Sequence, residues 1–344
     1  RKLRFGEPGV LEFDPRGSPG GSLPFEPVVS RDVTRERSMT ALLEELSARG
    51  MGVSAWVVYL YSHSLARLYP ERAALNAFGA RSEAHLCPAN PAVREYAVAL
   101  TDAVLAHAPL SGLVVESLGY APYDHGTLNL KAAVTPGPAA RMLLSLCFCE
   151  HCTARAADDV AALRREVTGV IERELDDLPD GPAARGATET WCRESPALAR
   201  LLDARAATAS SLQRTVLAAA RSAGLRTSTN SPGAKDERLT GVPSASVTDL
   251  VSDVRVDVVP SMTAETAARV IADARGSGGP DTAVFGLVQV GTFADERSFR
   301  SSLETAASLG IRQFRFYEYG LLSDRQLDWL RNAKDLWSER VSVG

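Results

Sequence analysis

The sequence lacks the features that mark several classes of protein. It has no run of Lys or Arg, and its formal net charge is −4. This balance argues against nucleic acid or an anionic membrane as the main partner. No apolar stretch reaches the roughly 18 residues that a membrane-spanning helix needs. Apolar residues make up 45% and charged residues 23%, which is ordinary for a globular protein and leaves an enzyme or a binding protein as the main classes.

Cysteine is also scarce, with five residues in a chain of 344. So few cysteines suit a reducing cytoplasm better than a secreted disulfide scaffold, and we expect a cytoplasmic location. No signal peptide is visible, although the chain begins at Arg1 rather than Met, which leaves a start upstream of this residue open.

Amphipathic helices alternate along the chain with nearly continuous apolar runs of strand length. Runs of this kind are typical of parallel strands that are covered on both faces. The predicted strands are 53–61, 110–117, 224–230, 254–262, 282–291 and 311–320.

We prefer a TIM (β/α)8 barrel as the fold class. A barrel of this kind needs eight strands, and the six predicted strands with an uncertain one at 23–29 make seven. Either the first strand lies upstream of Arg1, or the chain forms a doubly wound sheet. A dinucleotide-binding sheet needs a glycine-rich turn after an early strand, and GSPGGS at 17–22 follows no convincing strand. We predict a single barrel domain over 1–344, with 154–223 as a helical insertion after strand four.

Three of the five cysteines lie within six residues, in LLSLCFCEHCTA at 143–154. Cys147, Cys149 and Cys152 cannot easily pair with one another at this spacing without strain. Such a cluster is more often a metal or redox site than part of a disulfide framework. Three thiolates in one tight loop can reach a single Zn²⁺ at about 2.3 Å each.

A tetrahedral zinc site needs a fourth ligand, and the residues offer two candidates. His151 lies inside the cluster, and Cys87 lies in AHLCPANPAVREY. Cys192 is flanked by Arg and Glu in a helical context, and we interpret it as a lone buried thiol.

The cysteine pattern resembles that of the glycoside hydrolase family 42 β-galactosidases of clan A. Cys87-Pro88-Ala89-Asn90-Pro91 is similar to that family's Cys-Pro-x-Ser/Asn-Pro segment, and a C-x-C-x-x-C cluster follows it in both. YPERAALNAFG at 69–79 also looks like the stretch before that segment, so the resemblance covers 37–155. It implies a structural Zn²⁺ site. Its ligands would be Cys87, Cys147, Cys149 and Cys152.

The same resemblance implies a general acid/base at the end of strand four. Clan A enzymes place a Glu there, usually after an Asn, and this chain has Glu116 after Val115. A lone charge at the end of an apolar run is also where burial can bring a carboxyl pKa into a useful range.

The second carboxylate departs from the family pattern. The family places its nucleophilic Glu at the end of strand seven, where this chain has Gln289. Glu318 ends strand eight instead, and alternation predicts that it shares a face with Phe314 and Phe316. We predict Glu116 and Glu318 as the catalytic pair.

Further polar and aromatic residues gather at the predicted strand ends, which form one rim of a barrel. Tyr rings bind the apolar faces of sugars, while amides, carboxylates and imidazoles bind hydroxyl groups. The substrate-binding candidates are Tyr59, Tyr61, His63, Tyr120, Asp124, His125, Asn230 and Gln289.

The sequence therefore predicts a glycoside hydrolase-like enzyme that acts on a carbohydrate or glycoside through Glu116 and Glu318, with an oligomer of identical chains as one arrangement. One alternative is a carbohydrate-binding pseudoenzyme that lacks the strand-seven nucleophile, as Gln289 would suggest. A barrel lyase or isomerase is the other alternative.

Overall fold

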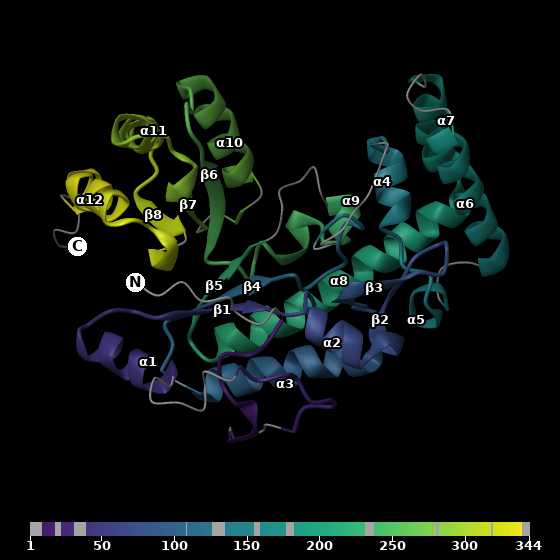
Figure 1. Cartoon of the computed structure of the whole chain (residues 1–344), viewed down its shortest axis with the longest axis horizontal. Helices are drawn as coiled ribbons and strands as arrows, with labels where there is room; N and C mark the ends of the chain where they lie inside the picture. The colour runs from purple at the N-terminus through teal and green to yellow at the C-terminus, as the bar shows by residue number, and fades with distance from the viewer. Residues whose placement is uncertain are drawn as a thin grey trace. The chain divides into compact units, whose positions relative to one another are not determined.

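The computed structural model describes residues 9–17, 22–30, 39–107, 109–125, 135–154, 159–176, 182–230, 237–276, 278–279, 282–317 and 319–338. The chain divides into two compact units, Arg1–Val247 and Thr248–Gly344. Figure 1 shows both, with the first in purple to green and the second in green to yellow. Each unit pairs parallel strands with helices, so the chain is α/β.

Three parallel strands form the centre of the first unit, in the order β1-β4-β5. They are β1 (Ser54–Val58), β4 (Gly112–Glu116) and β5 (Arg226–Thr229). The register places Val58 opposite Glu116 and Val115 opposite Thr229. Because the strands are parallel, their C-terminal ends meet at one edge of this sheet.

Helices account for most of the remaining residues of this unit. The longest, α8, begins after Ser195, whose side chain accepts a hydrogen bond from the Leu198 backbone, and it has proline at its first position. The helices are α1 (Met39–Ala48), α2 (His63–Leu68), α3 (Pro91–His107), α4 (Pro138–Leu144), α5 (Glu150–Thr153), α6 (Val160–Asp176), α7 (Pro182–Glu194), α8 (Pro196–Ser222) and α9 (Glu237–Thr240), with 3-10 turns η1 (Pro15–Gly17), η3 (Pro70–Arg72) and η5 (Ser244–Val247).

Helices α3 and α8 pack against each other beside the β1-β4-β5 sheet (Figure 1). The sheet face toward them is buried and includes Val57, Leu113 and Val115. Tyr59 continues this face past the end of β1, and its hydroxyl group forms a 2.9 Å hydrogen bond with Thr101 of α3. One face of the sheet thus belongs to the core.

A separate antiparallel pair, β2 (Ala73–Leu75) and β3 (Arg81–Leu86), follows β1. Cys87 directly follows β3, and the backbone N–H of Phe148 donates to the carbonyl of Leu75 at 2.6 Å. The hairpin therefore reaches the cysteine-rich segment between α4 and α5.

The second unit has three parallel strands in the order β6-β7-β8. Its core contains Val256 and Val258 of β6, Val288 of β7, and Phe299 of α11. Its elements are β6 (Asp253–Val258), α10 (Ala264–Gly276), β7 (Ala283–Gln289), η6 (Val290–Thr292), α11 (Glu296–Ser308), β8 (Gln313–Tyr317), η7 (Tyr319–Leu321), α12 (Asp324–Asn332) and α13 (Asp335–Ser338).

The predicted closed eight-stranded TIM barrel is wrong. All six predicted apolar runs contain parallel strands, but within the described residues these are three strands in each unit. The uncertain strand at 23–29 is reduced to one bridge between Leu11 and Val29, and β2 and β3 form a separate two-stranded sheet, with one further bridge between His85 of β3 and Tyr61. Continuous apolar runs identify buried parallel strands, but they carry no information on how many strands a sheet has or whether it closes.

We expect Phe299→Ala to lower the free energy of unfolding by about 3–5 kcal/mol, as is typical of a buried phenylalanine. Phe299 is fully buried against Phe293, Phe316 and Trp329. Phe78→Ala is the control, because Phe78 is 46% exposed and its loss should change stability by no more than about 0.5 kcal/mol. Urea unfolding measures both, and equal effects would contradict this account of the core.

Candidate functional site

Glu116 is the last residue of β4, at the C-terminal edge of the β1-β4-β5 sheet. Two side chains from the neighbouring strands hold its carboxylate. Trp56 of β1 donates from Nε1 to Oε2 at 2.5 Å, and Asn230, just after β5, donates from Nδ2 to the same oxygen at 2.8 Å. Within the described chain, Oε1 accepts no hydrogen bond. One carboxylate oxygen is therefore fixed and the other is left available.

The Glu116 side chain lies on the face of the sheet opposite to the buried one. Side chains alternate along a strand, so Trp56 and Val58 share this face with Glu116. Trp56 is 42% exposed and Val58 is 40% exposed, whereas Val57 between them is buried. An aromatic ring and a carboxylate thus meet on a surface that solvent reaches.

The residue after Glu116 has an unusual backbone. Ser117 has a φ of 53°, in the left-handed region that non-glycine residues rarely adopt. Its carbonyl nevertheless accepts the backbone N–H of Leu60 at 3.1 Å, so the chain after β1 holds this turn in place. Backbone strain of this kind concentrates at functional sites, which makes the end of β4 a candidate on geometric grounds.

A second group of aromatic and imidazole rings follows β1. Tyr61 contacts His63, His85 and His125, with ring centroids 5.4, 4.9 and 5.1 Å away. The Tyr61 hydroxyl group lies 3.3 Å from His63 Nε2, and His85 Nε2 lies 3.0 Å from the carbonyl oxygen of His125. Burial lowers the pKa of His85 to about 4, so this ring is neutral at pH 7.

The side chains of the other predicted substrate-binding residues have surroundings different from those of the Glu116 carboxylate. Tyr59 and Tyr120 are buried, and burial raises the pKa of both phenols. Asp124 forms a bidentate ion pair with Arg141 at 2.8 and 3.0 Å, which occupies both carboxylate oxygens. Gln289 is exposed at the end of β7 in the second unit.

The predicted second carboxylate, Glu318, lies outside the described residues, so its placement stays a prediction. Phe314 and Phe316, predicted to share its face, both pack against the core cluster that contains Phe299 and Trp329. The sequence pattern shows alternation along β8, but it cannot show which of the two faces meets the helices.

Trp56 was missed from the sequence, and the burial of His85 was not predicted. The apolar run VSAWVVYLY suggests a strand buried on both faces, which hides an exposed Trp56. His85 belongs to β3, whose apolar content is too low to predict its burial. The one signal that could have identified Trp56 is a tryptophan in a predicted strand of a sheet whose next strand along the chain ends in a lone glutamate, Glu116.

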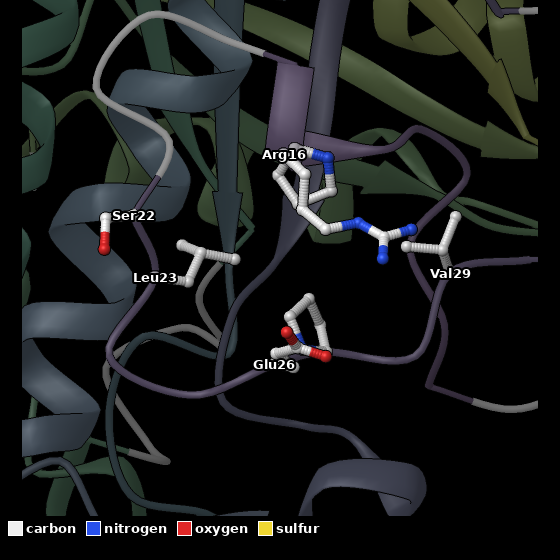
Figure 2. A pocket seen from close by; sticks show the side chains of 7 residues that line it. Arg16, Ser22, Leu23, Glu26 and Val29 are labelled. Carbon is white, nitrogen blue, oxygen red and sulfur yellow. The ribbon is translucent and has the colours of Figure 1, made fainter.

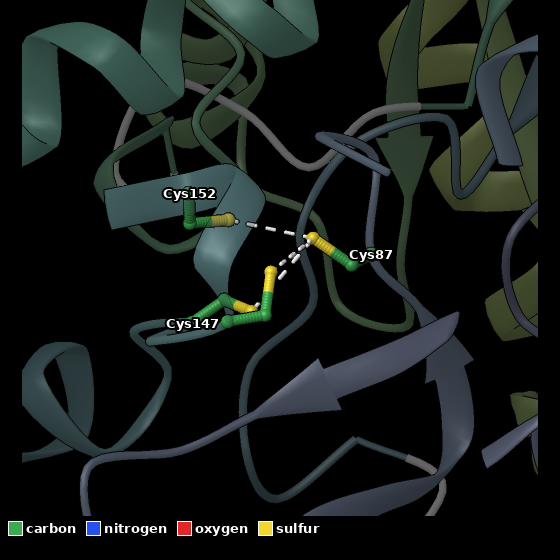
Figure 3. A group of neighbouring side chains, drawn as sticks. Cys87, Cys147 and Cys152 are labelled. Carbon is green, nitrogen blue, oxygen red and sulfur yellow. Dashed lines mark hydrogen bonds between the residues drawn. The ribbon is translucent and has the colours of Figure 1, made fainter. Parts of the chain in front are cut away.

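Four cysteine sulfurs form the second candidate site (Figure 3). The Cys87 sulfur lies 3.5, 3.4 and 3.7 Å from those of Cys149, Cys152 and Cys147. All four sulfurs lie within 4.8 Å of one another, and all four residues are buried. These distances exclude disulfides, whose sulfurs are about 2.05 Å apart. They are close to the edge of about 3.8 Å that four sulfurs form around a tetrahedral zinc ion at about 2.3 Å.

Neighbouring groups contact the cluster, and the four thiols shift one another's pKa values in different directions, upward for Cys87 and Cys152. The backbone N–H of Leu75 lies 3.3 Å from Cys147 Sγ, and the Tyr120 hydroxyl group lies 3.3 Å from Cys152 Sγ. Hydrogen bonds from Cys147 and the other two thiols lower the pKa of Cys149 well below its ordinary value. Four buried thiols with these partners can hold a metal ion. The alternative ligand His151 contacts Glu150 at 3.6 Å and is not part of the group.

A surface pocket of about 360 Å³ lies in the N-terminal segment (Figure 2). None of the predicted site residues contributes to it, and its Arg16 is paired with Asp14 at 2.8 Å. Its lining residues are Pro15, Arg16, Ser22, Leu23, Glu26, Pro27 and Val29. The pocket has one carboxylate, that of Glu26, and no aromatic side chain. It is therefore a weaker candidate for catalysis than the C-terminal edge of the β1-β4-β5 sheet.

No protein-family model and no curated protein matches the sequence. Among solved structures, the chain is similar to the glycoside hydrolase domain of PgaB (BpsB) from Bordetella bronchiseptica, with a TM-score of 0.47 and 14% sequence identity. The match covers 88% of this chain and 79% of that chain. The expected membership in glycoside hydrolase family 42 is not supported. A likeness at this level assigns no activity, so function has to follow from the residues of the site.

Among the described helices, none is both long and apolar enough to span a membrane.

The purified protein should contain about one equivalent of tightly bound divalent metal per chain, as expected for a closed site with four thiolates. Cys149→Ser should lose most of the metal, because serine does not replace a thiolate ligand. Cys192→Ser is the matched control, since Cys192 is the one cysteine outside the group. Elemental analysis after gel filtration measures the content. Equal metal content in the two variants would contradict the assignment.

Proposed function

We propose that this protein is a glycoside hydrolase-like enzyme in which Glu116 transfers a proton at the glycosidic oxygen. The observation that carries the proposal is the state of the Glu116 carboxylate, with Oε2 held by Trp56 and Asn230 and Oε1 without a hydrogen bond from any described residue. A carboxyl group that is anchored through one oxygen and open at the other is positioned for proton transfer at a strand end that substrate can reach.

The chemistry follows from the two oxygens. Protonated at Oε1, Glu116 gives its proton to the oxygen of the leaving group as the glycosidic bond breaks, through an oxocarbenium-like transition state. In a retaining reaction the carboxylate that remains then accepts a proton from the incoming water, which restores the starting form, whereas in an inverting reaction a second carboxylate accepts it. The N–H groups of Trp56 and Asn230 hold the carboxylate plane throughout, so no reorientation is needed between the two transfers.

Trp56 has a second role in this proposal. Its indole is anchored through the N–H while 42% of the residue remains exposed, which leaves ring surface for the apolar face of a sugar. Tyr61, which follows β1, and His125, which follows β4, contact each other and supply groups that can bind sugar hydroxyls, whereas His63 is buried and is left out. Tyr59 and Tyr120 are left out because both are buried in other contacts.

The proposal assigns no geometry to a second carboxylate. Glu318 remains the sequence-based prediction for that role, and the stereochemical outcome of the reaction depends on it.

We assign Zn²⁺ to the four-cysteine group. Four thiolates leave no open coordination position, so the ion is structural and takes no part in bond cleavage. Cys87 follows β3, while Cys147 and Cys149 lie between α4 and α5 and Cys152 lies in α5, so the ion would join two segments that are separate in the sequence.

Glu116→Gln tests the proposed proton transfer. We expect kcat/KM to fall by about 10²–10⁴-fold on a panel of 4-nitrophenyl glycosides, because glutamine keeps the shape of glutamate but cannot give or take the proton. Glu95→Gln, an exposed substitution on α3, is the control and should match the unmodified protein. Release of 4-nitrophenol at equal rates from all three proteins would refute the role of Glu116. Sugar binding by calorimetry with no cleavage would favour the carbohydrate-binding alternative.

Two substitutions at Trp56 separate its proposed roles. Trp56→Phe keeps an aromatic surface but removes the N–H that holds Oε2, so it should lower kcat by about tenfold with little change in KM. Trp56→Ala removes both and should also raise KM. Steady-state kinetics on the panel's best substrate measure the split, and identical effects of the two variants would show that the N–H and the ring do not act separately.

A further inference from the structure

Arg205 of α8 is a charged side chain in the interior of the first unit. It is 1% exposed and is among the largest fully buried side chains of the described residues. Burial of a guanidinium group is unfavourable unless hydrogen bonds and an opposite charge compensate it. The burial of Arg205 therefore needs an explanation.

Backbone carbonyls satisfy part of this requirement. Arg205 donates from Nη2 to the carbonyl oxygen of Leu239 at 2.9 Å and to that of Ser145 at 3.4 Å. It also donates from Nη1 to the carbonyl oxygen of Arg238 at 3.3 Å, while Nε has no partner. No carboxylate of the described chain forms an ion pair with Arg205. Carbonyl oxygens carry only partial charge, so the positive charge remains uncompensated by these contacts.

Tyr120 contacts both Arg205 and the four-cysteine group. The guanidinium carbon of Arg205 is 4.3 Å from the centre of the Tyr120 ring, and the Tyr120 hydroxyl group is 3.3 Å from Cys152 Sγ. Tyr120 and the cysteines also share one buried cluster with Ala209, which is one helical turn along α8 from Arg205. The cation and the sulfurs thus share an interior region, where solvent screens their interaction little.

Charge balance connects the buried Arg205 with the four-cysteine group. Four thiolates around one Zn²⁺ carry a net charge of −2, and burial of that charge also requires compensation. Burial lowers the pKa of Arg205, and nearby thiolate charge opposes this shift. The guanidinium group and the thiolates therefore stabilise each other's charged forms.

We infer that Arg205 is the counter-cation of a tetrathiolate metal centre, and that Tyr120 connects them by donating its hydroxyl hydrogen to Cys152 Sγ while its ring face contacts the guanidinium group. This inference rests on the proposed zinc site. It makes Arg205 a positioning residue that touches no metal ligand but sets the affinity for the metal, as outer partners of metal ligands do.

The experiment compares charge with hydrogen bonding at position 205. Arg205→Gln keeps donors for the carbonyl oxygens but removes the charge, and Arg205→Lys keeps the charge. We expect Arg205→Gln to weaken Zn²⁺ binding by about 10–100-fold, Arg205→Lys to recover at least half of that loss on a logarithmic scale, and Tyr120→Phe to weaken binding by about 3–10-fold. Competition with a chromophoric chelator measures the Zn²⁺ affinity of each full-length protein. The thiolate-to-metal absorption of the Co²⁺ forms reports whether four sulfurs still bind.

Leu201→Ala is the control, because Leu201 is buried on α8 one turn from Arg205 in a cluster that does not include the cysteines. It should destabilise the fold without changing the Zn²⁺ affinity. Unchanged affinity in Arg205→Gln, or equal loss in the Gln and Lys variants, would overturn the role of the charge. If Arg205→Gln does not fold, Tyr120→Phe decides, and unchanged affinity there overturns the inference. Failure of the unmodified protein to bind Zn²⁺ or Co²⁺ would instead reject the metal site itself.

Discussion

Parallel pairing of β1, β4 and β5 is the constraint on which the candidate active site depends. Parallel strands bring their C-terminal ends to one edge, so Trp56, Glu116 and Asn230 meet although the last two are 114 positions apart in the sequence. The register of β4 also decides on which face of the sheet the Glu116 side chain lies. A shift of one residue in β4 would turn Glu116 toward α3 and α8, where a carboxylate would lack both its donors and its access to solvent.

Contacts that begin at this edge continue to the four-cysteine group. Tyr120 lies four residues after Glu116, beyond the end of β4, and its backbone N–H donates to the carbonyl of Thr240 at 2.8 Å. Arg205 donates to the carbonyl oxygens of Arg238 and Leu239 in the same helix, α9. A metal ion held by the cysteines would therefore support the segment that directly follows β4. In this arrangement the ion affects the chemistry only by limiting the movement of that segment.

Sequence patterns predicted the local features and the cysteine group but not the contacts between distant segments. The predicted strand segments coincide with all parallel strands of the described residues, because a buried face leaves apolar residues in most of them, although Trp56 and Val58 of β1 are exposed. Cys87 was joined to the other cysteines through a motif whose order is visible in the chain. The hydrogen bond from Asn230 to Glu116 depends on the register of β4 with β5, which no local pattern contains. Arg205 is one of several arginines in α8, and only tertiary packing distinguishes it from its exposed neighbours.

Arg205 and Glu116 are stabilised in opposite ways, and the difference fits their proposed roles. Arg205 has hydrogen bonds on both terminal nitrogens, a ring face and nearby sulfurs, and it is closed to solvent, which suits a group whose charge must stay constant. Glu116 has both of its donors on one oxygen and is only partly buried. A third donor on Oε1 would hold the carboxylate more firmly, but it would occupy the atom through which a proton has to pass. Incomplete hydrogen bonding is therefore the feature of Glu116 that distinguishes a reactive carboxylate from a structural one such as Asp124, whose two oxygens are both occupied by Arg141.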